Sequence, residues 1–582
     1  MTQIIQSRLN DNAWARWTAL VLVASMMFFG YMFVDVMSPL ESLVEAERGW
    51  TPEAFGNYAA GEYILNVCGF LIIAGFILDK CGIRFTGTLS ASLMFIGAAI
   101  KFIGINDWFQ TTALATWLNS WWVSMPASAK MAAFGFMIFG CGCEMAGTTV
   151  SKAIAKWFKG KEMALAMGLE MAIARIGVFA IFSISPIIAE KMGTVVAPVA
   201  FCTVLLLIGL ISYIVFTFMD KKLDNELGEE ATADPEEEFR VSDIGKIFSS
   251  RIFWVVALLC VLYYSAIFPF QRYGANMLQC NLGISATTAS SIFRWFPIGA
   301  AVITPFLGNF LDKRGRGATM LMWGALLLIC CHLIFAFVVP ATSSAFIAYI
   351  TIVVLGVSFA LVPAALWPSV PKIIDEKVLG SAYCLIFWVQ NIGLCFVPVI
   401  IGTLLSTSNA DNAVVVQTKA FVENYQATMS AIDANNVVDF EKAYASLDSS
   451  YAELSKTHKG LSDEQRTVAV KNTYEAANIA MDSLKSFKAD MIQYMTANPT
   501  TEKKGSDFWG FMKSNQKEET VLTRDKAVLD RLGRDVFVPY RFTVPLLLFA
   551  CFGILALLFA IYLKALDKKK NYGLEAPNIK PE

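Results

Sequence analysis

The stretch GFILDKCGIR, residues 75–84, places three charged side chains at the end of a long apolar run. These side chains are Asp79, Lys80 and Arg84, and a second apolar run follows them directly. The stretch GNFLDKRGRG, residues 308–317, repeats the pattern G-x-x-L-D-K-x-G in the second part of the chain. Two copies of one short step between apolar runs predict a chain built from two similar halves.

The composition indicates a membrane protein. Of the 582 residues, 56% are hydrophobic and only 16% are charged, whereas a soluble domain carries about 25% charged residues. The net charge of -1 gives no basis for binding nucleic acid, so no nucleic-acid partner is expected. The lipid bilayer is the expected surrounding of most of the chain.

Apolar runs of about 20 residues or more recur along the chain and predict twelve membrane-spanning helices. Spans two and three are predicted over residues 53–79 and 82–104. The acidic stretch DNELGEEATADPEEEFR separates span six from span seven. The predicted organisation is an N-terminal six-helix half (1–219), a cytoplasmic acidic linker (220–250), spans seven to eleven (251–406), an extracytoplasmic insert (407–536), span twelve (537–564) and a cytoplasmic tail (565–582).

The distribution of Lys and Arg predicts the orientation. The short loops on the side of both termini carry most of these residues, and cytoplasmic loops are enriched in them. Both termini are therefore expected in the cytoplasm. No N-x-S/T acceptor (x not Pro) occurs, and the insert contains no Cys. These features favour a bacterial inner membrane, with the lysosomal membrane as the alternative.

The insert is polar but patterned. Its apolar residues recur every three or four positions, which is typical of a narrow stripe on a helix: Phe440, Tyr444, Leu447, Tyr451 and Leu454. We expect a helical hairpin or small bundle with a turn near residues 456–465. The insert could bind an accessory partner, mediate self-association, or be a solvated insertion without a partner.

Both charged steps resemble the signature G-x-x-x-D-[RK]-x-G-[RK]-x-[RK] of the major facilitator superfamily. The matching residues are Gly75, Asp79, Lys80, Gly82 and, one place displaced, Arg84, then Gly308, Asp312, Lys313, Gly315 and Arg316. The resemblance implies an all-α membrane fold of two pseudo-symmetric six-helix halves. The charged residues of both copies are expected to gate the cytoplasmic face, or else to anchor helix ends in headgroups: Asp79, Lys80, Arg84, Asp312, Lys313 and Arg316.

Five further motifs are similar to the branch of this superfamily that includes the animal lysosomal dipeptide transporters. They are WFKGKE (157–162), ARIG (174–177), YY…FPF (263–270), LWP (366–368) and QNIGL (390–394). The resemblance covers most of the membrane part and none of the insert. It implies uniport of short peptides, chiefly dipeptides, and for the animal member a lumenal accessory subunit.

Two charged residues lie at the centres of predicted spans, where ionisable side chains are usually functional. Glu144 lies in span four and Arg175 in span five, and we expect them at the same depth. Arg offers a planar fork of donors for a carboxylate, and Glu an anion for an ammonium group. The pair therefore predicts binding of a zwitterionic substrate, or else a permanent ion pair that holds two helices together.

Other polar residues in the spans are candidate contacts for the same substrate. Tyr263 and Tyr264 are central in span seven, and only one of them is expected to face the substrate. Asp35 and Glu62 lie in outer parts of spans one and two, and either contact the amino end of a ligand or line an outer vestibule. Arg272 and Arg294, near outer ends of spans, could act as gates. Span eleven adds central residues that could bind peptide backbone: Trp388, Gln390 and Asn391.

The sequence predicts an alternating-access transporter of small zwitterions, chiefly dipeptides, by uniport. One alternative is a proton-coupled organic-anion carrier or drug exporter, with Glu144 or Asp35 binding the proton. Another is a non-transporting scaffold or receptor that works through the insert. An enzyme is not expected, since no GxxxxGK[ST], HExxH or GxSxG motif occurs. No cofactor or metal is expected either.

Overall fold

The computed structural model describes residues 9–159, 161–227, 244–374, 379–497, 505–514 and 525–577. Residues 228–243 of the predicted linker 220–250 lie outside these residues, whereas helices include most of the rest. The described elements are helices, as lipid-facing segments require internal backbone hydrogen bonding. Those of the first half are η1 (Leu9–Asp11), α1 (Ala13–Val34), η2 (Ser38–Leu40), α2 (Glu41–Arg48), α3 (Pro52–Leu65), η3 (Asn66–Phe70), α4 (Leu71–Ile105), α5 (Asp107–Gln110), α6 (Ala113–Asn119), α7 (Ala127–Phe158), α8 (Met163–Met192) and α9 (Val196–Leu227).

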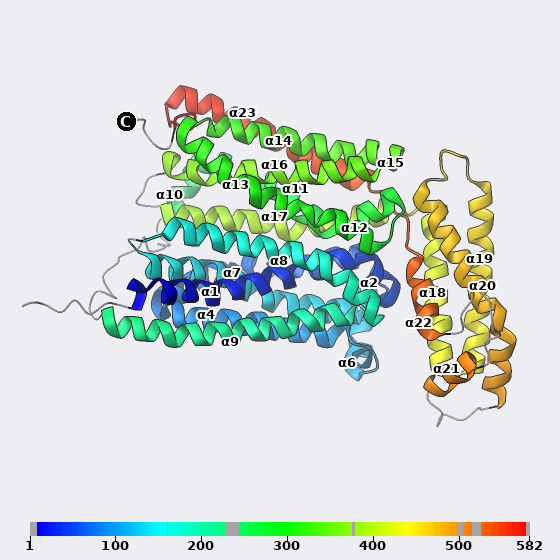
Figure 1. Ribbon diagram of the computed structural model, residues 1–582. Helices are drawn as coiled ribbons and strands as arrows, with labels where there is room; N and C mark the ends of the chain where they lie inside the picture. Colours follow the sequence, from blue (N-terminus) through cyan, green and yellow to red (C-terminus); the bar gives the residue numbers. More distant parts are fainter. Residues whose placement is uncertain are drawn as a thin grey trace, which may run out of the picture.

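The second half begins with the short helix α10 (Ile244–Ser249) and ends with α23 (Thr543–Lys570). The helices between these two are α11 (Arg251–Leu282), α12 (Ala286–Phe293), α13 (Trp295–Arg314), α14 (Gly317–Leu333), η6 (Ile334–Val338), α15 (Val339–Thr342), α16 (Ala345–Ile373) and α17 (Leu379–Ser408). The long helices of both halves lie side by side in one bundle (Figure 1). We call the end of the bundle at which α1 begins and α23 ends the terminal end, and the opposite end the insert end.

The second candidate span, Pro52–Ile105, is long enough to cross a membrane twice. Tyr58 and Lys101 lie near its opposite ends, yet the Lys101 ammonium donates a hydrogen bond to the Tyr58 hydroxyl. The chain therefore reverses between them, at Gly82, whose backbone is left-handed with a φ of 71°. With this reversal, the eleven candidate spans of the described residues are consistent with the twelve predicted crossings.

Small residues set the closest helix contacts inside the first half. A Cβ atom on Gly97 of α4 would lie 2.4 Å from the Gly135 carbonyl oxygen of α7. A Cβ atom on Gly135 would lie 2.5 Å from the Gly97 carbonyl oxygen in return. Such mutual contacts let two backbones approach closely within a membrane, where packing rather than hydrophobic burial drives helix association.

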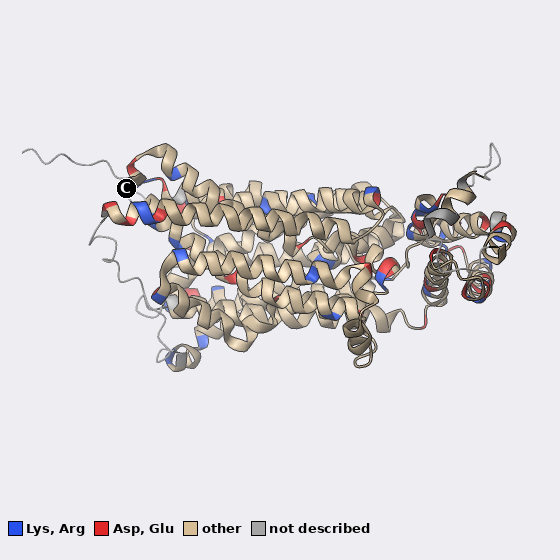
Figure 2. Cartoon of the chain, turned by 90° about the horizontal axis from the view of Figure 1, so that it is seen from below, with Lys and Arg blue, Asp and Glu red and all other residues tan. Residues whose placement is uncertain are grey.

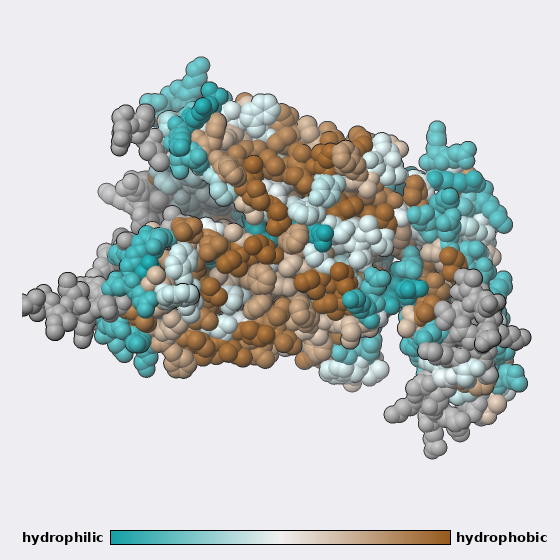
Figure 3. Space-filling view, viewed as in Figure 1, coloured by the Kyte–Doolittle hydropathy of each residue, from teal (hydrophilic) through white to brown (hydrophobic). Residues whose placement is uncertain are grey.

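The surface of the bundle fits a bilayer. A broad hydrophobic band covers its middle, while hydrophilic residues gather at the terminal end and over the insert (Figure 3). Charged residues are correspondingly sparse along the middle of the bundle and frequent at its ends (Figure 2). The chain is an integral membrane protein.

The insert is a separate helical bundle beyond the insert end (Figure 1). Its helices are α18 (Ala413–Asp433), α19 (Val437–Gly460), α20 (Val468–Ala497), α21 (Gly505–Ser514) and α22 (Lys526–Asp535). Phe440, Tyr444, Leu447 and Leu454 of the predicted stripe are buried in its apolar core. The turn between α19 and α20 falls at residues 461–467, next to the predicted position.

Candidate functional site

An ion cluster joins the two halves on the side of the insert end. Arg272 of α11 forms an ion pair with Asp35, which follows α1, at 3.1 Å, and a second pair with Glu62 of α3. All three side chains are at most 7% exposed. Gln271 donates a further hydrogen bond to the Asp35 carboxylate at 2.5 Å. Asp35 and Glu62, predicted to contact substrate or line a vestibule, thus hold the second half through Arg272.

Lys101 is a second buried cation beside this cluster. Its side chain is fully buried, and its ammonium lies over the rings of Phe33, Tyr58 and Phe136 at 4.4, 4.8 and 4.7 Å. It is also within electrostatic reach of Asp35. Two carboxylates and two cations therefore balance each other inside the bundle, which buried charges require.

Other contacts between the halves also gather toward the insert end. The Ser290 hydroxyl of α12 donates to the Phe182 carbonyl oxygen of α8, and the Thr287 hydroxyl donates to Glu190 at 3.0 Å. Arg294 donates to the Ser183 hydroxyl at 3.4 Å. The ring contact between Phe182 and Phe293 lies among them. The insert end is thus held closed by ion pairs, hydroxyl hydrogen bonds and aromatic packing.

Arg175 lies deeper in the bundle, on the terminal side of the ion cluster. Gly177, two residues later on α8, packs against the Phe28 carbonyl of α1, where a Cβ atom would lie 2.7 Å from the oxygen. Phe28 precedes Asp35 by about two helical turns, so Arg175 lies at a level of the bundle on the terminal side of the ion cluster. Its guanidinium lies over the ring of Phe359 on α16, 4.5 Å from the centroid. Arg175 therefore spans from the first half to the second.

Glu144 and Arg175 are not paired with each other. Both side chains are half-buried, and among the described residues neither forms a hydrogen bond or an ion pair. Both lie within electrostatic reach of the Tyr31 hydroxyl on α1. The predicted permanent ion pair is absent from this arrangement, which leaves one cation, Arg175, and two carboxylates, Glu144 and Glu170, near a shared phenol.

The adjacent tyrosines of α11 point to different neighbours. The Tyr263 hydroxyl donates to the Ser358 carbonyl oxygen and lies 2.9 Å from the Ser358 hydroxyl, inside the second half. Tyr264 accepts a hydrogen bond from the Trp367 indole at 3.3 Å and lies within electrostatic reach of Arg175. Tyr264 is therefore the one that faces the charged region, while Tyr263 ties α11 to α16.

The three predicted residues of α17 have separate surroundings. The Trp388 indole donates to the Val67 carbonyl oxygen at 2.9 Å, across the halves and onto the irregular turn η3. Gln390 accepts from the Cys260 thiol at 3.4 Å. Asn391 is 1% exposed, and its amide oxygen has no hydrogen-bond partner among the described residues. Asn391 is thus the one of the three that keeps a buried polar atom without a partner among the described residues.

At the terminal end, the charged residues of the first step bind within their own half. Asp79 pairs with Lys152 of α7 at 3.2 Å. Arg84 pairs with Asp224 of α9 at 2.5 Å, and Lys80 is exposed. These contacts brace α4 against its neighbours, and the predicted gating role stays a prediction.

The second step is covered by the C-terminal segment. Arg316 has a left-handed backbone, with a φ of 69°, and its amide donates to the Glu575 carbonyl oxygen at 3.0 Å. The Glu575 carboxylate accepts from the Thr319 amide at 2.8 Å. Asp312 is half-buried and Lys313 is exposed. The two steps are similar in sequence but have different partners.

Three residues of the central region were missed by sequence reasoning. Tyr31 is a phenol inside the apolar run MFFGYMF, and Lys101 is a cation inside a predicted span, so both had a visible signal. Phe359 had none, because one phenylalanine among many in an apolar helix carries no mark of its neighbours.

Comparisons with known proteins identify the family and the fold. The sequence profile described as Major Facilitator Superfamily matches residues 20–398. Lysosomal dipeptide transporter MFSD1 of Danio rerio is 28% identical over 400 residues, which are 67% of this chain and 80% of that protein. The Homo sapiens protein of the same name is 26% identical over 402 residues, with 67% and 80% covered.

Two solved structures share the fold. A mutant of the nucleoside transporter NupG superposes with a TM-score of 0.52 at 11% identity, over 76% of this chain and 99% of that one. A bacterial homologue of the human lysosomal transporter Spinster superposes with a TM-score of 0.50 at 12% identity, over 83% and 97%. At this identity the likeness concerns the fold alone.

Proposed function

The chain belongs to the Major Facilitator Superfamily, and from this membership and the site geometry we propose that it carries small zwitterions, chiefly dipeptides, by alternating access and uniport. The relatives in Danio rerio and Homo sapiens are named dipeptide transporters, which favours this substrate class. Glu144 and Arg175 supply the two charges that a zwitterion needs.

The observation that carries the proposal is the position of Arg175. It is held over Phe359 at 4.5 Å and has no carboxylate partner among the described residues. A half-buried guanidinium without an anion is costly unless a ligand supplies one. A peptide carboxylate fits its fork of donors, and the Glu144 carboxylate is then available for the peptide ammonium group.

Alternating access requires the two halves to rock against each other around the bound ligand. In this structure the ion cluster of Arg272, Asp35 and Glu62 closes the insert end. Opening that end must separate Arg272 from both carboxylates. We therefore assign the cluster as the outer lock and Arg175 with Glu144 as the binding site behind it.

The orientation belongs to the proposal as well. The excess of Lys and Arg near the terminal end favours a cytoplasmic position for this end, and we propose a bacterial inner membrane. A cysteine at Ser462, which is exposed between α19 and α20, should react with a membrane-impermeant maleimide in intact cells. Lack of reaction until the cells are lysed would reverse the orientation.

Counterflow in proteoliposomes tests the function. Labelled alanyl-alanine should exchange against unlabelled dipeptide, and Arg175→Lys should abolish exchange while the purified protein keeps its elution profile and Tm. Arg251→Lys is the matched control, because Arg251 is exposed at the start of α11. Exchange at the wild-type rate in Arg175→Lys would refute the site, and no exchange in the wild type would refute the substrate.

The same assay separates uniport from proton coupling. Exchange and net uptake independent of a pH gradient support uniport. Uptake that follows the pH gradient in the wild type but not in Glu144→Gln would support the proton-coupled alternative. Glu144 is the residue to test because it has no cation partner among the described residues.

A further inference from the structure

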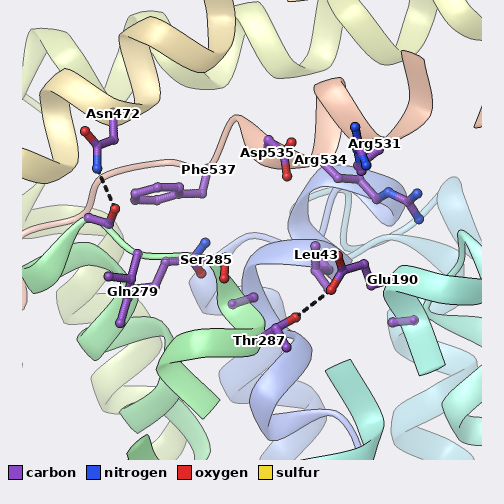
Figure 4. A pocket seen from close by; sticks show the side chains of 14 residues that line it. Leu43, Glu190, Gln279, Ser285, Thr287, Asn472, Arg531, Arg534, Asp535 and Phe537 are labelled. Carbon is purple, nitrogen blue, oxygen red and sulfur yellow. Dashed lines mark hydrogen bonds between the residues drawn. The ribbon is translucent and has the colours of Figure 1, made fainter. Parts of the chain in front are cut away.

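A cavity of about 230 Å³ lies where the insert meets both halves of the bundle. Figure 4 shows its walls: Glu190 from the end of α8, Thr287 from the start of α12, and Asn472, Arg531, Arg534, Asp535 and Phe537 from the insert and the segment after it. It is distinct from the central site, since Arg175 and Glu144 do not line it.

The insert is attached to both halves around this cavity. The Asn472 amide donates to the Gly283 carbonyl oxygen of the second half at 2.7 Å. Arg534 pairs with Glu47 of the first half at 3.6 Å, and its side chain is only 9% exposed. The cavity therefore exists in this form only while the insert and both halves are together.

The other charged side chains on its walls, Glu190, Arg531 and Asp535, are exposed to solvent. Among the described residues, Arg531 and Asp535 form no hydrogen bond or ion pair, and the Glu190 carboxylate accepts one hydrogen bond, from the Thr287 hydroxyl. Partial desolvation raises the pKa of Asp535, and the Glu190 carboxylate acts in the same direction, while Arg531 and Arg534 oppose it. Two carboxylates thus repel each other across the cavity.

This charge pattern selects the ligand class. An ammonium group between Glu190 and Asp535 would relieve their repulsion, and a carboxylate would find the fork of Arg531. An anion such as phosphate, bound by Arg531, would lie beside two carboxylates whose charge it cannot offset. Phe537, Leu43 and Ile284 add apolar wall for a side chain. The volume of about 230 Å³ is below the 300–1,000 Å³ or so typical of drug-sized ligands, so the cavity suits a small ligand.

We propose that this cavity is a second binding site for small zwitterions, in which Glu190 and Asp535 bind the ammonium group and Arg531 the carboxylate. The choice of a dipeptide as ligand rests on the proposed function. A ligand that touches the insert and both halves at once stabilises their closed arrangement by mass action. Occupancy of this site would therefore hold the insert end shut.

Hydrogen exchange on the purified full-length protein tests the site, with alanyl-alanine and alanine as probes. We expect either probe to slow exchange over residues 526–537 in the Arg175→Ala variant, whose central site is disabled. Arg531→Gln and Glu190→Gln should each raise the concentration needed at least about tenfold, as loss of a charged hydrogen bond does. Arg541→Gln and Glu423→Gln, exposed residues outside the cavity, are the matched controls.

The outcomes distinguish this site from the central one. Protection at 526–537 that survives Arg175→Ala supports the second site, even if the central site fails. Protection of α8 around Arg175 without any at 526–537 overturns the second site and leaves the proposed function standing. Protection at 526–537 that Arg531→Gln and Glu190→Gln leave unchanged also overturns it, as does a lack of protection by both probes.

Discussion

Replacement of Arg272 by glutamine should open the insert end. In the closed arrangement Arg272 neutralises Asp35 and Glu62, and the side chains of the three residues are 7%, 1% and 7% exposed. The neutral amide of the Arg272→Gln variant would leave two buried carboxylates with Lys101 as their only nearby cation among the described residues. In the open arrangement the same carboxylates reach water, so the substitution destabilises the closed state alone.

The size of the effect follows from these contacts. Removing one partner of a buried ion pair costs about 3–5 kcal/mol. At the lower figure the ratio of closed to open molecules falls by a factor of about 150, since 1.36 kcal/mol corresponds to a factor of ten. A shift of this size converts a minor open population into the major one.

Distances between two spin labels, measured by double electron–electron resonance, report the ratio of closed to open molecules. Lys191 at the end of α8 and Thr342 at the end of α15 are exposed on opposite halves near the insert end. A ketone-bearing amino acid at each position accepts a spin label without removal of the native cysteines. The wild type should give mainly the short distance, and Arg272→Gln mainly the long one.

Two further variants make the test specific. Arg294→Gln also removes an arginine between the halves, but Arg294 bonds a hydroxyl, Ser183, at 3.4 Å, and leaves no carboxylate behind; its shift should stay below about tenfold. The triple variant Asp35→Asn, Glu62→Gln, Arg272→Gln removes every charge of the lock and should recover the closed distance in part. The reasoning is refuted if Arg272→Gln matches the wild type or if the triple variant opens as far as the single one.

Three other perturbations have definite expected results. Phe359→Leu removes the ring 4.5 Å from the Arg175 guanidinium and should weaken dipeptide binding about 2- to 30-fold, the range of a cation–π contact; binding unchanged by calorimetry would contradict the role of the ring. Gly87→Ala places a Cβ atom 2.0 Å from Tyr213 Cζ and should lower the free energy of unfolding by about 1–3 kcal/mol, and with it the Tm. The control Gly147→Ala, where nothing lies within 4 Å of the new Cβ atom, should leave the Tm unchanged. Equal Tm values for the two variants would contradict the close packing at Gly87. Burial and Arg466 lower the pKa of His458. The stability that the neutral imidazole contributes is therefore present above its unfolded pKa of about 6.5 and is lost as the pH falls below this value. Hydrogen exchange of residues 437–497, corrected for intrinsic rates, should accelerate at acidic pH, and His458→Phe should remove this pH dependence.

The sequence by itself determined the membrane class, the helical fold and the two-half architecture. Apolar run length is a local property, and bilayer thickness converts it directly into spans. The repeated step at Asp79 and Asp312 indicated two similar halves. A tight turn and a helix end each depend on a few neighbouring residues, so both are visible in the sequence. The central charges Glu144 and Arg175 were visible for the same reason: an ionisable residue stands out in an apolar run.

Only the tertiary structure decided which charges meet. Arg272, Asp35 and Glu62 come from helices of different halves, and Arg272 is more than 200 residues from either carboxylate in the sequence. Sequence placed Glu144 beside Arg175, yet helix rotation turned Arg175 toward Phe359 and left Glu144 without a cation among the described residues. The cavity under the insert is likewise a product of packing, since its walls come from α8, α12 and α22. Rotation about a helix axis and the docking of separate helices depend on the whole set of contacts, which no local pattern encodes.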